Sequence, residues 1–181
     1  MGPPEDEPCA GTKEVIRPVA ITRDFVMRQY EITQTDWLDV LGNVGNPASH
    51  LTCGGDCPVE QITWLDGVKF CNAWSALEGL EECYDIVKED GVTTVTWPLG
   101  PACTGYRLPT DAEWEYAYRA GKESAFYNGA ITACNGSDPN LSAIGWYKAN
   151  SLNKTHFYGY KDANGWGLWD MSGNVTEWVW D

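Results

Sequence analysis

The sequence predicts an α+β fold with a high coil content, built from a few short helices, hairpins and long loops. Helical segments with clear caps are few, and turn residues are abundant, with 19 Gly and 10 Pro among 181 residues. Ten Trp and nine Tyr supply large side chains to anchor the loops. The length suits one domain with a substantial core. We expect residues 1–12, rich in Pro and acidic side chains, to form a flexible acidic arm and residues 13–181 to form the domain.

The first elements predicted are a hairpin and a short helix. Residues 15–21 and 24–31 alternate between apolar and polar side chains, as paired strands do. Thr33 is a suitable N-cap for a helix over residues 34–41, and Asp36 lies in its first turn.

A longer helix follows after a loop over residues 42–58. Thr63 caps it, Asp66 stands three residues later, and Gly79 ends it. Four side chains at helical spacing are assigned to the core: Val68, Cys71, Trp74 and Leu77.

A second hairpin is predicted over residues 84–97. Two alternating runs flank the turn signal Glu-Asp-Gly at 89–91. Residues 122–166 show no convincing period and are expected to be mostly loop.

Residues 105–121 carry the strongest local signals of the chain. Thr110 is a natural N-cap, and Glu113 completes a capping box with it. Gly121 is expected to form a left-handed C-cap. One stripe of this helix should face a core of aromatic residues, and it contains Trp114, Ala117 and Tyr118.

Charge and composition exclude several classes of function. Lys and Arg number 12 against 26 Asp and Glu, so the formal net charge is 12 − 26 = −14. Nucleic acid and anionic membranes are therefore poor partners. No apolar run approaches the ~18 residues of a membrane span. The two histidines, His50 and His156, are far apart and offer little for a histidine metal centre or a catalytic triad.

Seven cysteines favour disulfides in an oxidising compartment, because their spacing matches no zinc motif. We expect Cys53 to pair with Cys57, and Cys83 to pair with Cys103 across the second hairpin. The sequence leaves three cysteines unassigned: Cys9, Cys71 and Cys134.

Three motifs together resemble the formylglycine-generating enzyme (sulfatase-modifying factor) family. They are PVEQITW at 58–64, GYRLPTDAEWEYAYRAG at 105–121 and GLWDMSGNVTEW at 167–178. In addition, YEITQ at 30–34 resembles the family's first strand, where it turns into a helix. The resemblance covers the chain from about residue 14 to its last residue. It implies a compact fold of low secondary-structure content, distantly related to C-type lectin-like domains.

The resemblance also implies structural calcium. The matching positions make Asp170 and Glu177 carboxylate ligands, with Gly173 and Val175 as carbonyl ligands. Such an oxygen-only set suits a hard cation. The alternative is an acidic turn before a strand. For a second family calcium site, two residues correspond to the first ligands, Asn140 and Leu141.

Catalysis in this family depends on a cysteine pair that binds copper(I), a metal suited to soft thiolates. The copper-bound pair activates oxygen, which oxidises a cysteine in a sulfatase Cys-x-Pro-x-Arg segment to formylglycine. It follows an Arg-Gly-Gly-Ser-type segment well after the third motif, and no cysteine of this chain occupies an equivalent position. The sequence thus predicts no catalytic residue in this chain, and copper only if a C-terminal part supplies the thiols.

The final residues suggest a larger fold. Trp178 and Trp180 should lie on one side of a strand without a partner strand to cover them. We expect the chain to be the N-terminal portion of a domain completed by a C-terminal fragment or a second protein chain.

Three hypotheses remain for function. The first is an extracytoplasmic formylglycine-generating-enzyme-like protein whose activity depends on the complementing part. The second is a non-catalytic extracytoplasmic module that binds protein or carbohydrate, since a fold does not fix a chemistry. Loop aromatics that could serve it are Trp146, Tyr147, Trp166 and Trp169. The third hypothesis is that the chain is a relative of the sulfoxide synthases of thiohistidine biosynthesis. That activity needs an iron site built from histidines on another domain.

Overall fold

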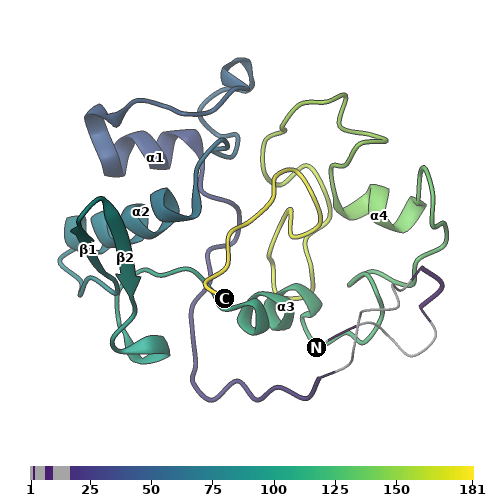
Figure 1. Ribbon diagram of the computed structural model, residues 1–181. Helices are drawn as coiled ribbons and strands as arrows, with labels where there is room; N and C mark the ends of the chain where they lie inside the picture. The colour runs from purple at the N-terminus through teal and green to yellow at the C-terminus, as the bar shows by residue number, and fades with distance from the viewer. Residues whose placement is uncertain (1, 3–6, 10–16) are drawn as a thin grey trace.

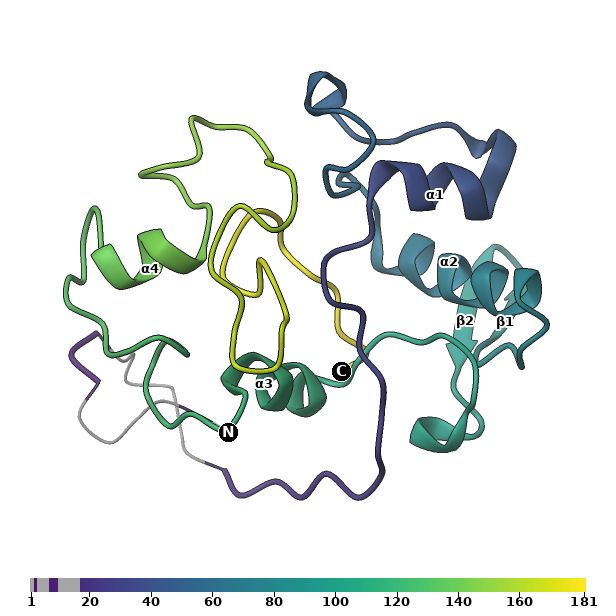
Figure 2. The same ribbon diagram turned by 180° about the vertical axis from the view of Figure 1, so that it is seen from behind.

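The computed structural model describes residue 2, residues 7–9 and residues 17–181. Within these residues, regular structure consists of four α-helices, one two-stranded sheet and three short 3-10 helices, and the rest is coil. This confirms a mixed helix and strand fold with much coil. Figure 1 places α1, α2 and the β1–β2 hairpin in one half and α4 with its long loops in the other. Helix α3 and the final segment lie between the halves, as the reverse view in Figure 2 also shows.

Helices α1 (Gln34–Leu41) and α2 (Trp64–Leu77) begin where the sequence predicts. Each starts with a complete capping box, in which a threonine hydroxyl and an aspartate three residues later exchange hydrogen bonds with backbone N–H groups. The two helices pack through Trp37 and Phe70, whose rings stack 5.3 Å apart. The 3-10 helices Gly42–Val44 and Leu51–Cys53 lie in the loop that joins α1 to α2.

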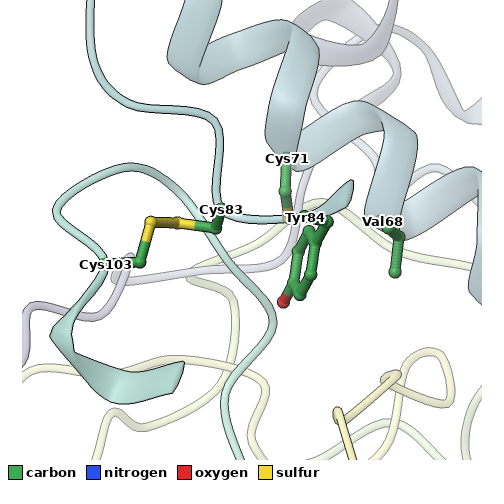
Figure 3. Close-up of a cluster of buried hydrophobic side chains, with 5 residues drawn as sticks. All are labelled: Val68, Cys71, Cys83, Tyr84 and Cys103. Carbon is green, nitrogen blue, oxygen red and sulfur yellow. A yellow bond between two sulfur atoms is a disulfide. The ribbon is translucent and has the colours of Figure 1, made fainter. Parts of the chain in front are cut away.

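The core beneath α2 includes a disulfide. Figure 3 shows Val68 and Cys71 on α2 beside Tyr84 and the Cys83–Cys103 disulfide, and all five residues are buried. Of the four core residues predicted on α2, Trp74 is half-buried and Leu77 is 64% exposed.

The assignment of Leu77 to the core was therefore wrong. Ser75 is fully buried instead, because its hydroxyl donates to the Cys71 carbonyl and accepts from the Tyr106 N–H. Hydrogen bonding, and not hydropathy alone, determines which face of the last turn of α2 points inward.

The predicted second hairpin is present. Strand β1 (Asp85–Glu89) pairs antiparallel with β2 (Val92–Thr96). The turn residues Asp90 and Gly91 adopt φ values of 50° and 80°, the left-handed conformation that such a tight turn needs. The short 3-10 helix Gly100–Ala102 follows β2 and leads to Cys103.

Helix α3 (Asp111–Arg119) has the predicted capping box between Thr110 and Glu113. Its left-handed C-cap is Ala120, with φ 45°, so the prediction that Gly121 would be the cap was one residue late. Gly121 follows with φ 80°. The predicted stripe of α3 packs on the second core cluster, which contains Ala117, Tyr127, Ile144, Leu168 and Met171.

The predicted first hairpin is wrong for its described part. Residues 17–31 form no strand, while positions 15 and 16 lie outside the described residues. Phe25 and Met27 alternate inward because they pack against the second core cluster, so the alternation reflects one-sided burial without strand pairing.

The long loop after α3 contains a helix that the sequence pattern missed. Helix α4 (Pro139–Ile144) is only six residues long, too short to show a period. Asp138 caps it by accepting a hydrogen bond from the Leu141 N–H, and Pro139 occupies its first position.

The cysteines form three disulfides. The two predicted pairs, Cys53–Cys57 and Cys83–Cys103, are present, and Cys9 pairs with Cys134. None of the described helices is both long and apolar enough to span a bilayer.

The final segment, residues 175–181, forms no strand. Trp180 packs between Trp64, Tyr84 and Trp97 in the core beneath α2, so the expectation that it would be uncovered was wrong. Trp178 remains 45% exposed.

Candidate functional site

The C-terminal loop, residues 167–177, contains the four residues of the predicted calcium motif. It is held against residues 145–146, where the Asn174 N–H donates to the Trp146 carbonyl over 2.7 Å. A Cβ atom on Gly173 would lie 2.2 Å from the Trp146 carbonyl oxygen. This close backbone approach, together with a φ of 111°, requires glycine at position 173.

Asp170 points its carboxylate into the protein. The residue is 1% exposed and adopts a left-handed φ of 58°. Its Oδ2 atom accepts a hydrogen bond from the Gly159 N–H at 3.2 Å, while Oδ1 is buried without a hydrogen-bond partner. A buried carboxylate oxygen without a donor is unfavourable unless a cation or proton compensates for it. Asp170 therefore fits the role of a ligand to a hard cation.

Glu177 lies at the other end of the loop and contacts α3. Its Oε2 atom accepts a short hydrogen bond from the indole N–H of Trp114. This bond aligns the Glu177 carboxylate with the interior, because Trp114 belongs to the inward stripe of α3.

A third carboxylate, Glu31, joins these two from the segment before α1. Its Oε2 atom accepts from the Asn174 side-chain amide at 2.8 Å, and its Oε1 atom accepts from the Val175 N–H at 3.3 Å. Sequence reasoning missed Glu31 as a site residue. The sequence feature that could have identified Glu31 is its place in YEITQ at 30–34, the segment that resembles the family's first strand.

The three carboxylates have raised pKa values because burial disfavours their charged forms. Burial is the main cause for Glu31, and repulsion from Glu177 and Asp170 adds to it. Attraction to His156 and Lys161 offsets part of the shift of the Asp170 pKa. The cluster therefore favours either a bound proton or a bound cation.

The acidic side chains do not make a metal site on their own. In the described part of the chain, no group of three or more His, Cys, Asp or Glu side chains is arranged to hold a metal ion. The calcium motif relies instead on two carboxylates and two backbone carbonyls, as the sequence predicts, and it stays a prediction.

The residues of the predicted second calcium site lie on α4, and their polar groups are already engaged. The Asn140 side-chain amide donates to the Ala130 carbonyl, and the Asn140 carbonyl accepts from the Asn128 side chain. The Leu141 carbonyl accepts from the Gly145 N–H. The second site also stays a prediction.

The cysteines bear directly on redox chemistry. Six of the seven are paired in disulfides, and Cys71 is the remaining thiol. Cys71 is 8% exposed, and burial raises its pKa to about 12. A buried thiol that resists deprotonation is a poor nucleophile and a poor metal ligand. The chain therefore supplies no pair of free thiols, so its cysteines do not fit a copper(I) site.

Three of the loop aromatics proposed for ligand binding contact other residues of the chain. Trp146 stacks on His156 at 3.7 Å, and the Tyr147 hydroxyl is hydrogen-bonded to Ser142 and the Asp138 N–H. Trp166 is 48% exposed and packs beside Tyr116.

Comparison with known proteins identifies the scaffold. The family described as the sulfatase-modifying factor enzyme 1-like domain matches residues 10–181. The chain is 37% identical to the chaperone protein LppX of Paenibacillus barcinonensis over 87% of its own length. It is also 37% identical to the formylglycine-generating enzyme of Mycobacterium tuberculosis, over 50% of its own length. The chain covers 62% of the LppX sequence and 30% of the mycobacterial enzyme.

Two solved structures are similar to this chain in fold. Treponema denticola variable protein 1 superposes with a TM-score of 0.70 at 31% identity, covering 84% of this chain and 60% of that chain. PvdO from Pseudomonas aeruginosa also gives a TM-score of 0.70 at 22% identity, covering 100% of this chain and 66% of that chain, which supports the fold alone. From the match over residues 10–181, the chain belongs to the sulfatase-modifying factor, or formylglycine-generating-enzyme-like, family.

Proposed function

We propose that this chain acts as a non-catalytic, extracytoplasmic binding module of the family, with another protein as its ligand. Six cysteines are in disulfides and the seventh is buried, and this carries the proposal for the residues of this chain, not for any polypeptide that completes the domain. Three disulfides also support an oxidising compartment. The likeness to a relative named as a chaperone protein supports a protein ligand.

A surface suited to such a ligand lies where two loops meet. The His50 ring nitrogen Nε2 lies 3.3 Å from the Asn153 carbonyl, which connects the loop around residue 50 to the loop around residue 153. Both loops lie at the same end of the molecule in Figure 1 and Figure 2. Four large apolar side chains on these loops are 38–79% exposed, and we call them the apolar loop patch: Leu51, Leu152, Phe157 and Tyr160. Exposed apolar side chains on adjoining loops are typical of protein interaction sites.

A calcium ion bound by Asp170, Glu177 and the carbonyls of Gly173 and Val175 would support this module structurally. The unpartnered Asp170 Oδ1 atom is the main support for the ion. Bound calcium would offset the repulsion between the carboxylates and fix the loop.

An aggregation assay tests the binding function. The protein is mixed with chemically denatured citrate synthase, and aggregation is followed by light scattering. We expect suppression by the wild type and weaker suppression by the Leu152→Lys, Tyr160→Lys double variant. The control is Leu77→Lys, which changes a 64% exposed leucine at the end of α2. No suppression by the wild type, or equal loss in the control, would count against the apolar loop patch.

A second candidate is a copper-dependent oxidase completed by further polypeptide that supplies the thiols. The match to the mycobacterial formylglycine-generating enzyme favours it. The protein is incubated with copper(I), oxygen and a Cys-x-Pro-x-Arg peptide, and the mass of the peptide is then measured by mass spectrometry. We expect an unchanged cysteine with this chain alone. Conversion to formylglycine by this chain alone would overturn the non-catalytic proposal.

A further inference from the structure

The segment before α1 is tied to the C-terminal loop through one side chain. Both carboxylate oxygens of Glu31 accept hydrogen bonds from that loop, one from the Asn174 side chain and one from the Val175 N–H. The partners are 143 and 144 residues away in the sequence. The Val175 bond holds the backbone next to a carbonyl that belongs to the calcium motif.

Two further contacts keep this junction closed. The Trp169 N–H donates to the Gln29 carbonyl at 2.8 Å, and the Tyr30 ring stacks on Tyr158 at 3.8 Å. In Figure 1 and Figure 2 the segment that leads into α1 runs beside the final segment of the chain. Glu31 therefore lies at the junction between the segment before α1 and the C-terminal loop.

Asn174 is fixed from a second direction as well. Its side-chain oxygen accepts from the His156 N–H at 2.9 Å, and its amide donates to the His156 carbonyl at 3.0 Å. Asn174 adopts a left-handed φ of 59°, which asparagine tolerates better than most residues. Glu31 thus holds an Asn174–Val175 turn whose backbone is already constrained by residue 156.

The charge of Glu31 is hard to explain by hydrogen bonding alone. The carboxylates of Glu177 and Asp170 repel a charged Glu31. One buried oxygen of Asp170 also has no hydrogen-bond donor. A glutamine at this position would keep one acceptor and remove the repulsion. Three carboxylates with an unpartnered oxygen among them are expected where a cation compensates for their charge.

We propose that Glu31 is a positioning residue for the C-terminal loop: it holds the Asn174–Val175 turn and adds a third negative charge, so that cation binding fastens residues 29–31 onto residues 167–177. This inference rests on the proposed calcium site and extends it to a residue outside the calcium motif. Calcium then stabilises the junction between the segment before α1 and the C-terminal loop, and not the loop alone.

The test compares Glu31→Gln with the wild type by calcium titration. Calcium binding is measured by calorimetry, and the melting temperature is measured in chelator and in saturating calcium. We expect about tenfold to hundredfold weaker calcium affinity in the variant, as for residues that orient metal ligands. We also expect a smaller rise in melting temperature on adding calcium.

A merely structural role gives a different result. If Glu31 only made hydrogen bonds, Glu31→Gln would lower the melting temperature equally in chelator and in calcium, with unchanged affinity. That result would overturn the inference. Glu89→Gln is the matched control, because it removes one exposed carboxylate from β1 and should leave affinity unchanged.

A ligand variant separates this inference from the proposed site. Asp170→Ala removes both side-chain oxygens of one ligand of the calcium motif and should abolish measurable calcium binding. If Asp170→Ala abolishes binding while Glu31→Gln binds like the wild type, the site stands and the role of Glu31 fails. If wild-type protein neither binds calcium nor gains stability from it, the proposed site itself fails.

Discussion

Arg107 and Glu113 show how one ion pair connects a turn to a helix start. The guanidinium of Arg107 makes two hydrogen bonds to Glu113, at 2.6 and 2.7 Å, and both side chains are largely buried. Glu113 also accepts from the Thr110 N–H as part of the capping box. Burial alone would raise the pKa of Glu113, but the bonds from Arg107 and Thr110 hold that pKa below its usual value.

This lowered pKa predicts a pH-dependent contribution to stability. Because the folded-state pKa of Glu113 lies below the unfolded value, its stabilisation is present above the unfolded pKa and is lost as pH falls through the folded pKa. At neutral pH, Glu113→Gln should lower the free energy of unfolding by about 3 kcal/mol, since it leaves Arg107 without its charged partner.

Urea unfolding from about pH 7 to about pH 3 checks this, and the gap between wild type and variant should shrink as pH falls. Glu89→Gln, at an exposed position, provides the baseline. A gap that stays constant across this range would contradict the assigned role of the Glu113 charge.

Among the elements, the C-terminal loop depends on its close packing against residues 145–146. A Cβ atom on Gly145 would lie 1.6 Å from the Ser172 carbonyl oxygen, so Gly145→Ala must displace the loop. We expect it to lower the free energy of unfolding by about 2 kcal/mol or more and to weaken calcium binding.

Gly165→Ala is the matched control for that substitution. Its added Cβ would meet its nearest neighbour at 3.9 Å, an ordinary contact, so its effect should stay within about 0.5 kcal/mol. Urea unfolding and calcium calorimetry of both variants provide the check. Equal effects would show that the loop does not depend on this backbone approach.

The three helices with a threonine cap and the hairpin around the Asp90–Gly91 turn could be predicted from the sequence, whereas α4 and the course of residues 17–31 could not. Thr33, Thr63 and Thr110 each face a carboxylate three residues later, and each starts a helix as predicted. Alternation alone was less reliable, because Phe25 and Met27 alternate for packing and pair with no strand. Helix α4 is recognisable only through its cap and its proline.

The candidate site was predictable only in part for a similar reason. Asp170 and Glu177 lie in a local motif and could be named from the sequence. Glu31 contacts Asn174 of the same loop across 143 residues, and only the tertiary fold brings it there. The calcium itself and the lectin-like relationship stay predictions.

At the scale of the whole molecule, the disulfides differ in how much chain they constrain. Cys9 and Cys134 are 125 residues apart, whereas Cys53 and Cys57 are four residues apart. A crosslink stabilises mainly by limiting the unfolded chain, and more so for longer loops. Replacing both members of the Cys9–Cys134 pair by serine should lower the free energy of unfolding by about 4–5 kcal/mol.

The Cys53→Ser, Cys57→Ser variant is the comparison, with an expected loss of about 2 kcal/mol. Urea unfolding under non-reducing conditions measures both. A larger loss for the short pair would mean that native packing, and not chain entropy, governs the contribution of these disulfides.

Six of the seven cysteines in this family scaffold are paired in disulfides and Cys71 is buried, so the chain has no pair of reactive thiols. Counting thiols checks this, using a maleimide reagent on the non-reduced protein before and after unfolding in denaturant, followed by intact mass. We expect no labelled thiol in the native protein and one, Cys71, after unfolding. Two or more labelled cysteines in the native protein would show that reactive thiols are present.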